Sequence, residues 1–69
     1  MKIFITDHAR QRMKQRGVTL LELSHVLRFP LTIRNSHDGK KIAVGIVNNR
    51  NIHIVFFPRE NYIKIITVM

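Results

Sequence analysis

Residues 18–30 read VTLLELSHVLRFP, and at the end of this stretch the sequence changes from a helical pattern to a strand-like one. Four apolar residues form a stripe at helical spacing: Leu20, Leu23, Val26 and Leu27. Thr19 and Glu22, three positions apart, have the pattern of a capping box. Pro30 ends the helix, because the residue before a proline avoids the helical conformation. The stretch therefore predicts a helix that begins after Thr19 and ends before Pro30.

The residues before this stretch predict an earlier helix over 7–16, which reads DHARQRMKQR. Thr6 or Asp7 can cap its start, since either side-chain oxygen can accept a hydrogen bond from a free N–H of the first turn. Gly17 suits the left-handed position just past a helix end. Earlier still, residues 2–6 read KIFIT; they alternate briefly and could form a short strand.

The residues after Pro30 predict four strands separated by short turns. We expect the strands over 31–36, 41–49, 51–57 and 62–69. Asp38 and Gly39 between alternating runs favour a hairpin, and such short connections make neighbouring strands antiparallel. The predicted fold class is α+β, with two N-terminal helices packed on an antiparallel meander of about four strands. Residues 2–6 could add a fifth strand to this meander.

The size and charge of the chain limit what it can be. Its 69 residues, 45% of them hydrophobic, suffice for one domain with a modest core, so we expect a single domain over residues 1–69. The net charge is +8, from 12 basic and 4 acidic residues, which suggests an anionic partner. A membrane surface is the weakest candidate, because the apolar face of the helix over 7–16 holds only Ala9 and Met13. Nucleic acid and an acidic protein remain.

Several classes of site and location are disfavoured by composition. The sequence has no cysteine, which excludes disulfides, thiolate zinc sites and a cysteine nucleophile. The four histidines lack the spacing of metal ligands, so we expect neither a metal nor another cofactor. No apolar run approaches the roughly 20 residues that cross a bilayer, and the N-terminal apolar stretch is too short for a signal peptide. These features predict a cytoplasmic protein.

Helical spacing sorts the residues over 7–16 into strips. The side facing the core carries Ala9 and Met13. The neighbouring strip carries His8, Arg12 and Gln15, Arg16 lies between that strip and the core, and Lys14 points to solvent. His8 and Arg12 are close enough to act on one anion, and the start of a helix favours a bound phosphate. The same residues also fit an ordinary surface, with the Arg16 stem lying over the core.

The motif HARQRMKQRG at 8–17 fits the pattern His-Ala-x-x-Arg-Met-x-x-Arg-Gly, and the chain closes with IKIITVM at 63–69. The whole order resembles the small bacterial and archaeal family called domain of unknown function 4258. That family is similar to the RelE and BrnT ribonuclease toxins of toxin–antitoxin pairs. The resemblance implies a RelE-like fold, RNA cleavage and a cognate antitoxin as partner. It also implies that Thr67 donates a hydrogen bond to a phosphate oxygen.

Metal-free RNA cleavage needs a base for the 2′-OH proton, cations for the phosphate and an acid for the departing 5′-oxygen. His8 is the predicted base or acid, because the pKa of histidine lies near neutrality. Arg12 and Arg16 are the predicted phosphate clamp, because arginine stays charged and binds two oxygens at once. The products would be a 2′,3′-cyclic phosphate and a 5′-hydroxyl. The RNA could be free or on the ribosome.

Five further residues are predicted to contact nucleic acid: Lys14, Gln15, His53, Tyr62 and Lys64. His53 lies mid-strand, on the face opposite Ile52 and Ile54, and also fits a buried structural histidine. Tyr62 could stack on a base or act as an acid, and it also fits half-buried packing at a strand end. Lys64 could follow an RNA backbone or protect a sheet edge from aggregation.

Two alternatives to the ribonuclease remain. A non-catalytic nucleic-acid-binding module explains the charge equally well, although the sequence shows no recognition helix and no aromatic stacking motif. A small protein-interaction module that docks an acidic partner explains it too. Cleavage of RNA would indicate the ribonuclease, and salt-sensitive RNA binding without cleavage would indicate the binding module. Tight binding of an acidic partner without affinity for RNA would indicate the interaction module.

Overall fold

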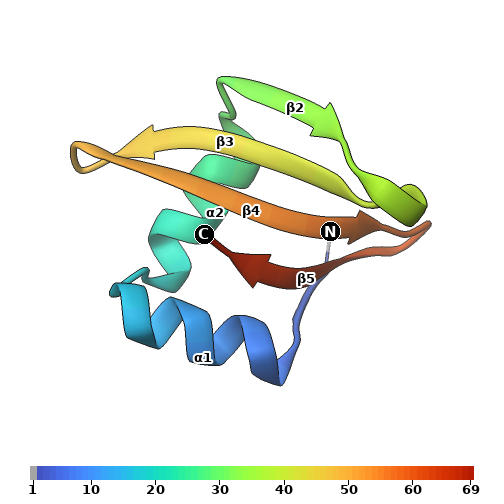
Figure 1. Cartoon of the computed structure of the whole chain (residues 1–69), viewed down its shortest axis with the longest axis horizontal. Helices are drawn as coiled ribbons and strands as arrows, with labels where there is room; N and C mark the ends of the chain where they lie inside the picture. Colours follow the sequence, from blue (N-terminus) through green and yellow to red (C-terminus); the bar gives the residue numbers. More distant parts are fainter. Residues whose placement is uncertain (1) are drawn as a thin grey trace.

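The computed structural model describes residues 2–69 and shows two α-helices and a five-stranded sheet (Figure 1). In chain order the elements are β1 (Lys2–Ile5), α1 (Asp7–Arg16), α2 (Leu20–Arg28), β2 (Thr32–Asn35), the 3-10 turn η1 (His37–Gly39), β3 (Lys41–Val47), β4 (Arg50–Pro58) and β5 (Tyr62–Val68). The predicted α+β class is confirmed: both helices precede the four-stranded meander, and the N-terminal residues add a fifth strand.

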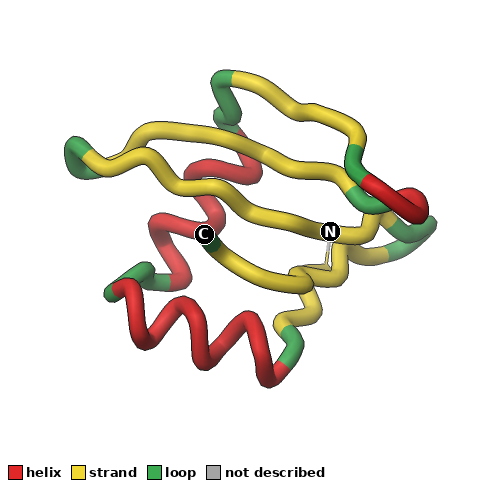
Figure 2. The backbone as a smooth tube through the Cα atoms, in the orientation of Figure 1, coloured by secondary structure: helices red, strands yellow, loops and turns green. Residues whose placement is uncertain are grey.

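The sheet has the strand order β1-β5-β4-β3-β2. Strands β2 to β5 are antiparallel neighbours, as the short turns predict. Strand β1 instead pairs in parallel with β5, so the sheet is mixed. The tube in Figure 2 can be followed from β1 through both helices and the meander before β5 returns beside β1. The two ends of the chain therefore build one side of the sheet together.

The turn between β3 and β4 lies earlier in the chain than the sequence indicates, at Asn48 and Asn49. Asn48 and Asn49 have φ angles of 52° and 63°, both in the left-handed region. Two successive residues of this kind suit the tight hairpin turn that matches the twist of antiparallel strands. Strand β3 therefore ends at Val47 rather than at residue 49, and β4 begins at Arg50 rather than at residue 51.

Both helices begin and end where the sequence predicts. Thr6 caps α1 by accepting a hydrogen bond from the Ala9 N–H at 3.1 Å, and Gly17 after α1 is left-handed with φ 67°. Thr19 and Glu22 form the predicted capping box at the start of α2. Neither helix is long and apolar enough to cross a membrane.

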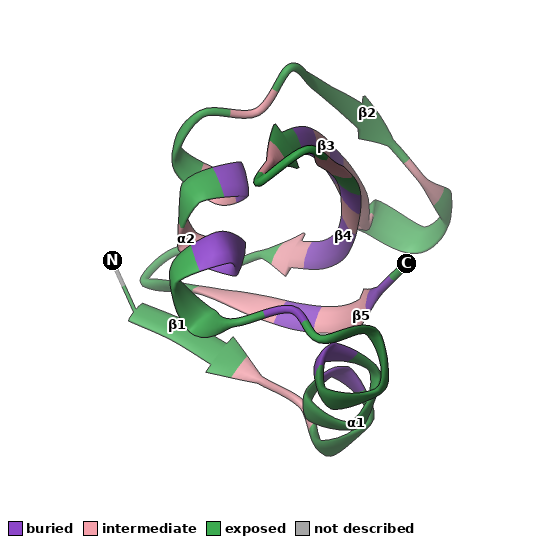
Figure 3. Cartoon of the chain, turned by 90° about the vertical axis from the view of Figure 1, so that its left-hand side faces the viewer, coloured by how far each residue is buried: buried purple, intermediate pink, exposed green. Residues whose placement is uncertain are grey.

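The core lies on the face of the sheet that the helices cover, as the buried residues in Figure 3 show. Helix α1 packs against β5, and α2 packs against β3 and β4. The largest fully buried side chains are Leu23, Val26, Ile52, Ile54, Ile65 and Val68. Of the apolar stripe on α2, Leu23 and Val26 are fully buried, whereas Leu20 is 59% exposed. Leu20 lines an open hollow together with Met13 and Val18.

Candidate nucleic-acid interface

Helix α1 presents the predicted cationic residues to solvent. Ala9 and Met13 are buried, which confirms the predicted core-facing side. His8, Arg12 and Arg16 are all exposed, four residues apart in succession, and are called the α1 strip below. Side chains four residues apart are neighbours on a helix, so the strip follows one side of α1.

The start of α1 is fastened to β5 through Thr6. The Thr6 N–H and the Thr6 hydroxyl both donate to the Ile65 carbonyl, at 3.2 Å and 2.9 Å. At the other end of α1, Arg16 lines a surface hollow together with Met69. The helix therefore runs alongside the stretch of chain from Ile65 to Met69, and Thr67 lies in the middle of that stretch.

The two sides of α1 face different parts of the molecule. Arg10 and Lys14 line a hollow with Leu20 at the start of α2. Arg16 lines its hollow with Asn51 and Met69, on the opposite side. The α1 strip is thus directed away from α2. Lys14, predicted to contact nucleic acid, lies on the α2 side and apart from the strip, whereas helical spacing sets the exposed Gln15 beside it.

Two further predicted residues, Thr67 and His53, lie on the helix-free face of the sheet. Thr67 pairs with Val55, and His53 pairs with Met69 through backbone hydrogen bonds of 2.8 Å and 3.2 Å. The neighbouring Ile54 and Val68 point into the core, so Thr67 and His53 point to the other face. Both side chains are half-buried.

Tyr62 and Lys64 lie on the same helix-free face, at the beginning of β5. A register shift in β5 opposite the Val55–Phe56 step leaves Ile66 as an extra residue. Without it, strict alternation would set Tyr62 and Lys64 on the face opposite Thr67. The predicted residues therefore fall on two parts of the molecule: the α1 strip lies on a helix, whereas Thr67, His53, Tyr62 and Lys64 lie on the helix-free face of the sheet.

The cations of α1 have no acidic partner among residues 2–69. The one ion pair within these residues joins Arg50 Nη2 to Glu22 Oε1 at 3.9 Å. Arg12 and Arg16 make neither an ion pair nor a side-chain hydrogen bond in the described part of the chain. Their guanidinium groups are free to bind an anion from solution.

Among the described residues Glu22 is the buried acidic side chain, and its contacts are structural. It accepts hydrogen bonds from the Thr19 N–H at 2.9 Å and from Asn48 Nδ2 at 2.9 Å. These two bonds, the Thr19 bond foremost, lower the pKa of Glu22, with burial opposing them and the Arg50 charge assisting. The contact with Thr19 is predicted from the sequence. The contact with Asn48 joins positions 26 residues apart, and no local pattern signals it.

Potential metal ligands do not cluster in the described residues: no group of three or more His, Asp or Glu side chains is close enough to hold an ion.

Three aromatic or basic residues that were not predicted, Lys2, Phe4 and Phe57, share the helix-free face with Tyr62 and Lys64. Their signal in the sequence is alternation within residues 2–6, which sets Lys2 and Phe4 on one face. The pairing of β1 with β5, which sequence alone does not give, brings them to Tyr62.

The fold and the site together define a small basic α+β domain with an exposed, unpaired cationic helix. The family model described as domain of unknown function (DUF4258) matches residues 5–69, and the chain belongs to this family. This confirms the resemblance found in the motif at 8–17. No curated protein and no solved structure gives a significant match. The further likeness to RelE and BrnT stays a prediction.

Proposed function

We propose that the protein is a metal-independent endoribonuclease and the toxin of a toxin–antitoxin pair, acting on RNA in the cytoplasm. The observation that carries the proposal is the α1 strip. It sets an imidazole and two guanidinium groups in a row on an exposed helix side, with no carboxylate of residues 2–69 to neutralise them. The net charge of +8 and the predicted likeness to RelE and BrnT add support.

In this proposal the residues divide the work of a phosphodiester cleavage. His8 removes the proton from the 2′-hydroxyl or supplies one to the leaving 5′-oxygen. Arg12 and Arg16 bind the phosphate oxygens and stabilise the charge that builds on them. Thr67, on the stretch of β5 that α1 follows, donates a hydrogen bond to the same phosphate. The 2′-oxygen bonds to phosphorus as the bond to the 5′-oxygen breaks.

One observation favours a second candidate function, a nucleic-acid-binding module that does not cleave. Within the described residues no hydrogen bond orients the His8 ring, whereas a catalytic imidazole is commonly held by a partner side chain or carbonyl. Binding of phosphates needs no such orientation. The charge and the α1 strip serve this function equally well.

The test incubates the purified protein with total cellular RNA in EDTA and maps new 5′-hydroxyl ends. We expect His8→Ala to lower the cleavage rate by about 10²- to 10⁴-fold, the usual contribution of a general acid or base. Arg12→Ala should also lower it. Arg10→Ala is the matched control, because it removes the same charge from the side of α1 that faces α2.

The outcomes separate the candidates. Cleavage that survives both His8→Ala and Arg12→Ala, with circular dichroism unchanged, would contradict the assigned site. If the native protein cleaves neither free RNA nor messenger RNA on added ribosomes, the ribonuclease proposal is wrong. Salt-sensitive RNA binding would then establish the binding module. Capture of an acidic protein with no affinity for RNA would instead indicate an interaction module.

A further inference from the structure

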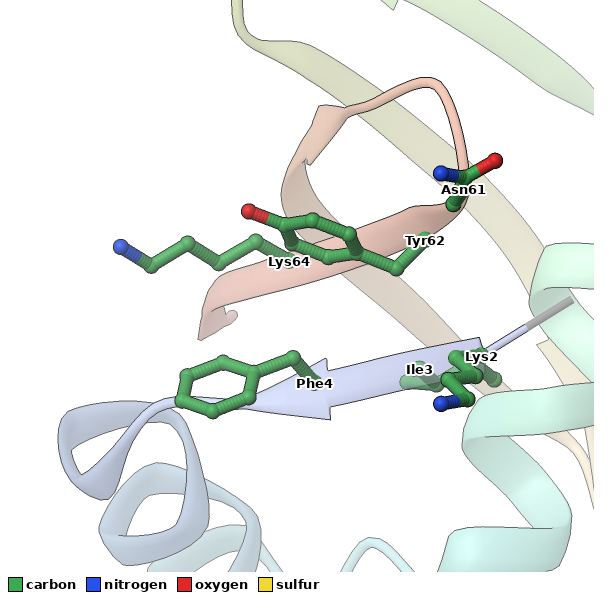
Figure 4. A pocket seen from close by; sticks show the side chains of 6 residues that line it. All are labelled: Lys2, Ile3, Phe4, Asn61, Tyr62 and Lys64. Carbon is green, nitrogen blue, oxygen red and sulfur yellow. The ribbon is translucent and has the colours of Figure 1, made fainter.

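A groove of about 480 Å³ lies between β1 and the beginning of β5 (Figure 4). Its lining residues come from the two strands and the turn before β5: Lys2, Ile3, Phe4, Asn61, Tyr62 and Lys64. The volume falls in the range of roughly 300–1,000 Å³ that is typical of small-molecule sites. The groove is separate from the α1 strip, because none of its lining residues belongs to α1.

The parallel pairing of β1 with β5 alternates aromatic and cationic residues across the groove. Lys2 is in register with Tyr62, and Phe4 is in register with Lys64. The rings of Phe4 and Tyr62 and the stem of Lys64 border the open space in Figure 4. Phe4 is 57% exposed and Tyr62 is 37% exposed, which is unusual for rings that could have packed in a core.

The two rings differ from the third aromatic side chain on this face. Phe57 of β4 is in register with Lys64 of β5. The Phe57 ring is covered by two cations, with Arg59 Cζ 4.8 Å and Lys40 Nζ 5.7 Å from the ring centroid. No cation of the described chain lies over Phe4 or Tyr62 in this way. Their faces remain available to another flat group, while Phe57 has its partners within the protein.

We propose that this groove binds the bases of a single-stranded RNA. Bases stack on Phe4 and Tyr62, and Lys2 and Lys64 contact the adjoining phosphates. Free ring faces beside lysines are the combination that single-stranded nucleic acid requires. No carboxylate lines the groove, so the charge fits a polyanion. The inference rests on the proposed function, since it assigns the strand on which the α1 strip acts.

The groove and Thr67 lie along the same strand, β5. Tyr62 and Thr67 both point to the helix-free face of β5 and are five residues apart, which is about 16 Å of extended chain. An RNA whose phosphate is bound at Thr67 can thus reach the groove within a few nucleotides. The strand held there must be unpaired, because bases inside a duplex offer no free face for Phe4 and Tyr62.

The test measures binding alone, by fluorescence anisotropy with a short single-stranded RNA that carries 2′-O-methyl groups and cannot be cleaved. A strand with the same number of phosphates but no bases is the matched probe. We expect Phe4→Ala and Tyr62→Ala each to weaken binding of the first strand by roughly 5- to 100-fold. Tyr62→Phe keeps the ring and should bind like the native protein.

The control variant is Phe29→Ala, because Phe29 is 66% exposed after α2 and is not among the residues that line the groove. It should leave affinity unchanged. No variant should alter the weaker binding of the strand that lacks bases, since that strand uses charge alone. Circular dichroism checks that each variant is folded.

Three results would overturn the inference: equal affinity of the Phe4→Ala and native proteins, equal affinity for the strands with and without bases, or no binding of the non-cleavable strand. If Phe4→Ala instead dissociates a dimer in sedimentation while RNA binding is unchanged, the groove is a contact between copies of the chain. None of these results decides the ribonuclease proposal. That proposal depends on cleavage and on His8.

Discussion

The two helices of this protein begin in the same way and are held in different ways. Both have a threonine cap, yet α2 closes its cap with its own Glu22, whereas α1 joins its cap to the backbone of β5. Helix α2 buries Leu23 and Val26 completely. Helix α1 buries only Ala9 and Met13. Because the alanine side chain is a single methyl group, this pair removes less apolar surface from water than Leu23 and Val26 of α2 do.

The difference teaches which helix is free to carry function. Most of the surface of α1 is not committed to packing, and it carries four arginine or lysine residues, compared with one on α2. Hydrogen bonds from the Thr6 N–H and the Thr6 hydroxyl to β5 hold α1 in position without restricting which side chains its outer sides present. We infer that α2 maintains the fold and that α1 meets the partner.

The largest effect on stability is expected in α2. Leu23→Ala should lower the free energy of unfolding by about 2–5 kcal/mol, because Leu23 is fully buried and its removal leaves a cavity. Leu21→Ala, two positions away and 83% exposed, is the matched control and should change it by less than about 0.5 kcal/mol. Urea unfolding measures both. Similar losses in the two variants would contradict the buried position of Leu23.

A smaller loss of stability should follow from adding a side chain where α2 packs closely on β3. A Cβ at Gly45 would approach Val26 Cγ1 to 3.0 Å and Cγ2 to 3.1 Å. Gly45→Ala should therefore cost about 1–3 kcal/mol in thermal or urea unfolding, as overpacking of a core does. Combined with Val26→Ala, the loss should be less than the sum of the two single losses, because the clash is relieved. Additive losses would show that Val26 of α2 does not pack closely against Gly45.

The attachment of α1 should be weaker still. Thr6→Ala removes the cap of α1 and the hydroxyl that donates to β5, and it should cost about 1 kcal/mol of stability. Thr6→Ser retains the hydroxyl and should recover most of that loss. If Ser and Ala at this position give the same unfolding midpoint, the hydroxyl bonds do not hold α1 in place.

The smallest effect is expected in the pH dependence of stability. The pKa of Glu22 in the folded protein is lowered by the Thr19 and Asn48 hydrogen bonds. The ionised carboxylate therefore stabilises the folded protein at pH above its ordinary value of 4.5, and this contribution is lost as the pH falls through the lower folded pKa. Glu22→Gln should unfold more easily near neutral pH and differ less from the native protein in acid. Parallel pH profiles of urea unfolding would contradict this role.

Local chemistry made much of the fold predictable. The capping box at Thr19, the left-handed Gly17 and the helix boundary before Pro30 each depend on a few adjacent residues, and all appear as predicted. The parallel pairing of β1 with β5 was not predictable in this way, because residues about 60 positions apart must meet. The exposure of Leu20 within the apolar stripe of α2 was not predictable either, because burial depends on where neighbouring elements pack and not on helical spacing alone.

The candidate site also has parts that adjacent residues predict and parts that depend on distant residues. The strip of His8, Arg12 and Arg16 follows from helical spacing alone, and the structure retains it as an exposed row. The separation of Lys14 from that row depends on where α2 lies, and the meeting of Phe4 with Tyr62 depends on the β1–β5 register. Neither arrangement is encoded in one local stretch.

The most direct test of the division between the helices is an amide chemical-shift titration of the ¹⁵N-labelled protein with the non-cleavable single-stranded RNA. We predict that the perturbed amides lie on α1, β1 and β5, with the largest shifts along the α1 strip and the smallest on α2. Perturbations concentrated on α2, or none at saturating RNA, would contradict the claim that α1 is the helix that meets the partner.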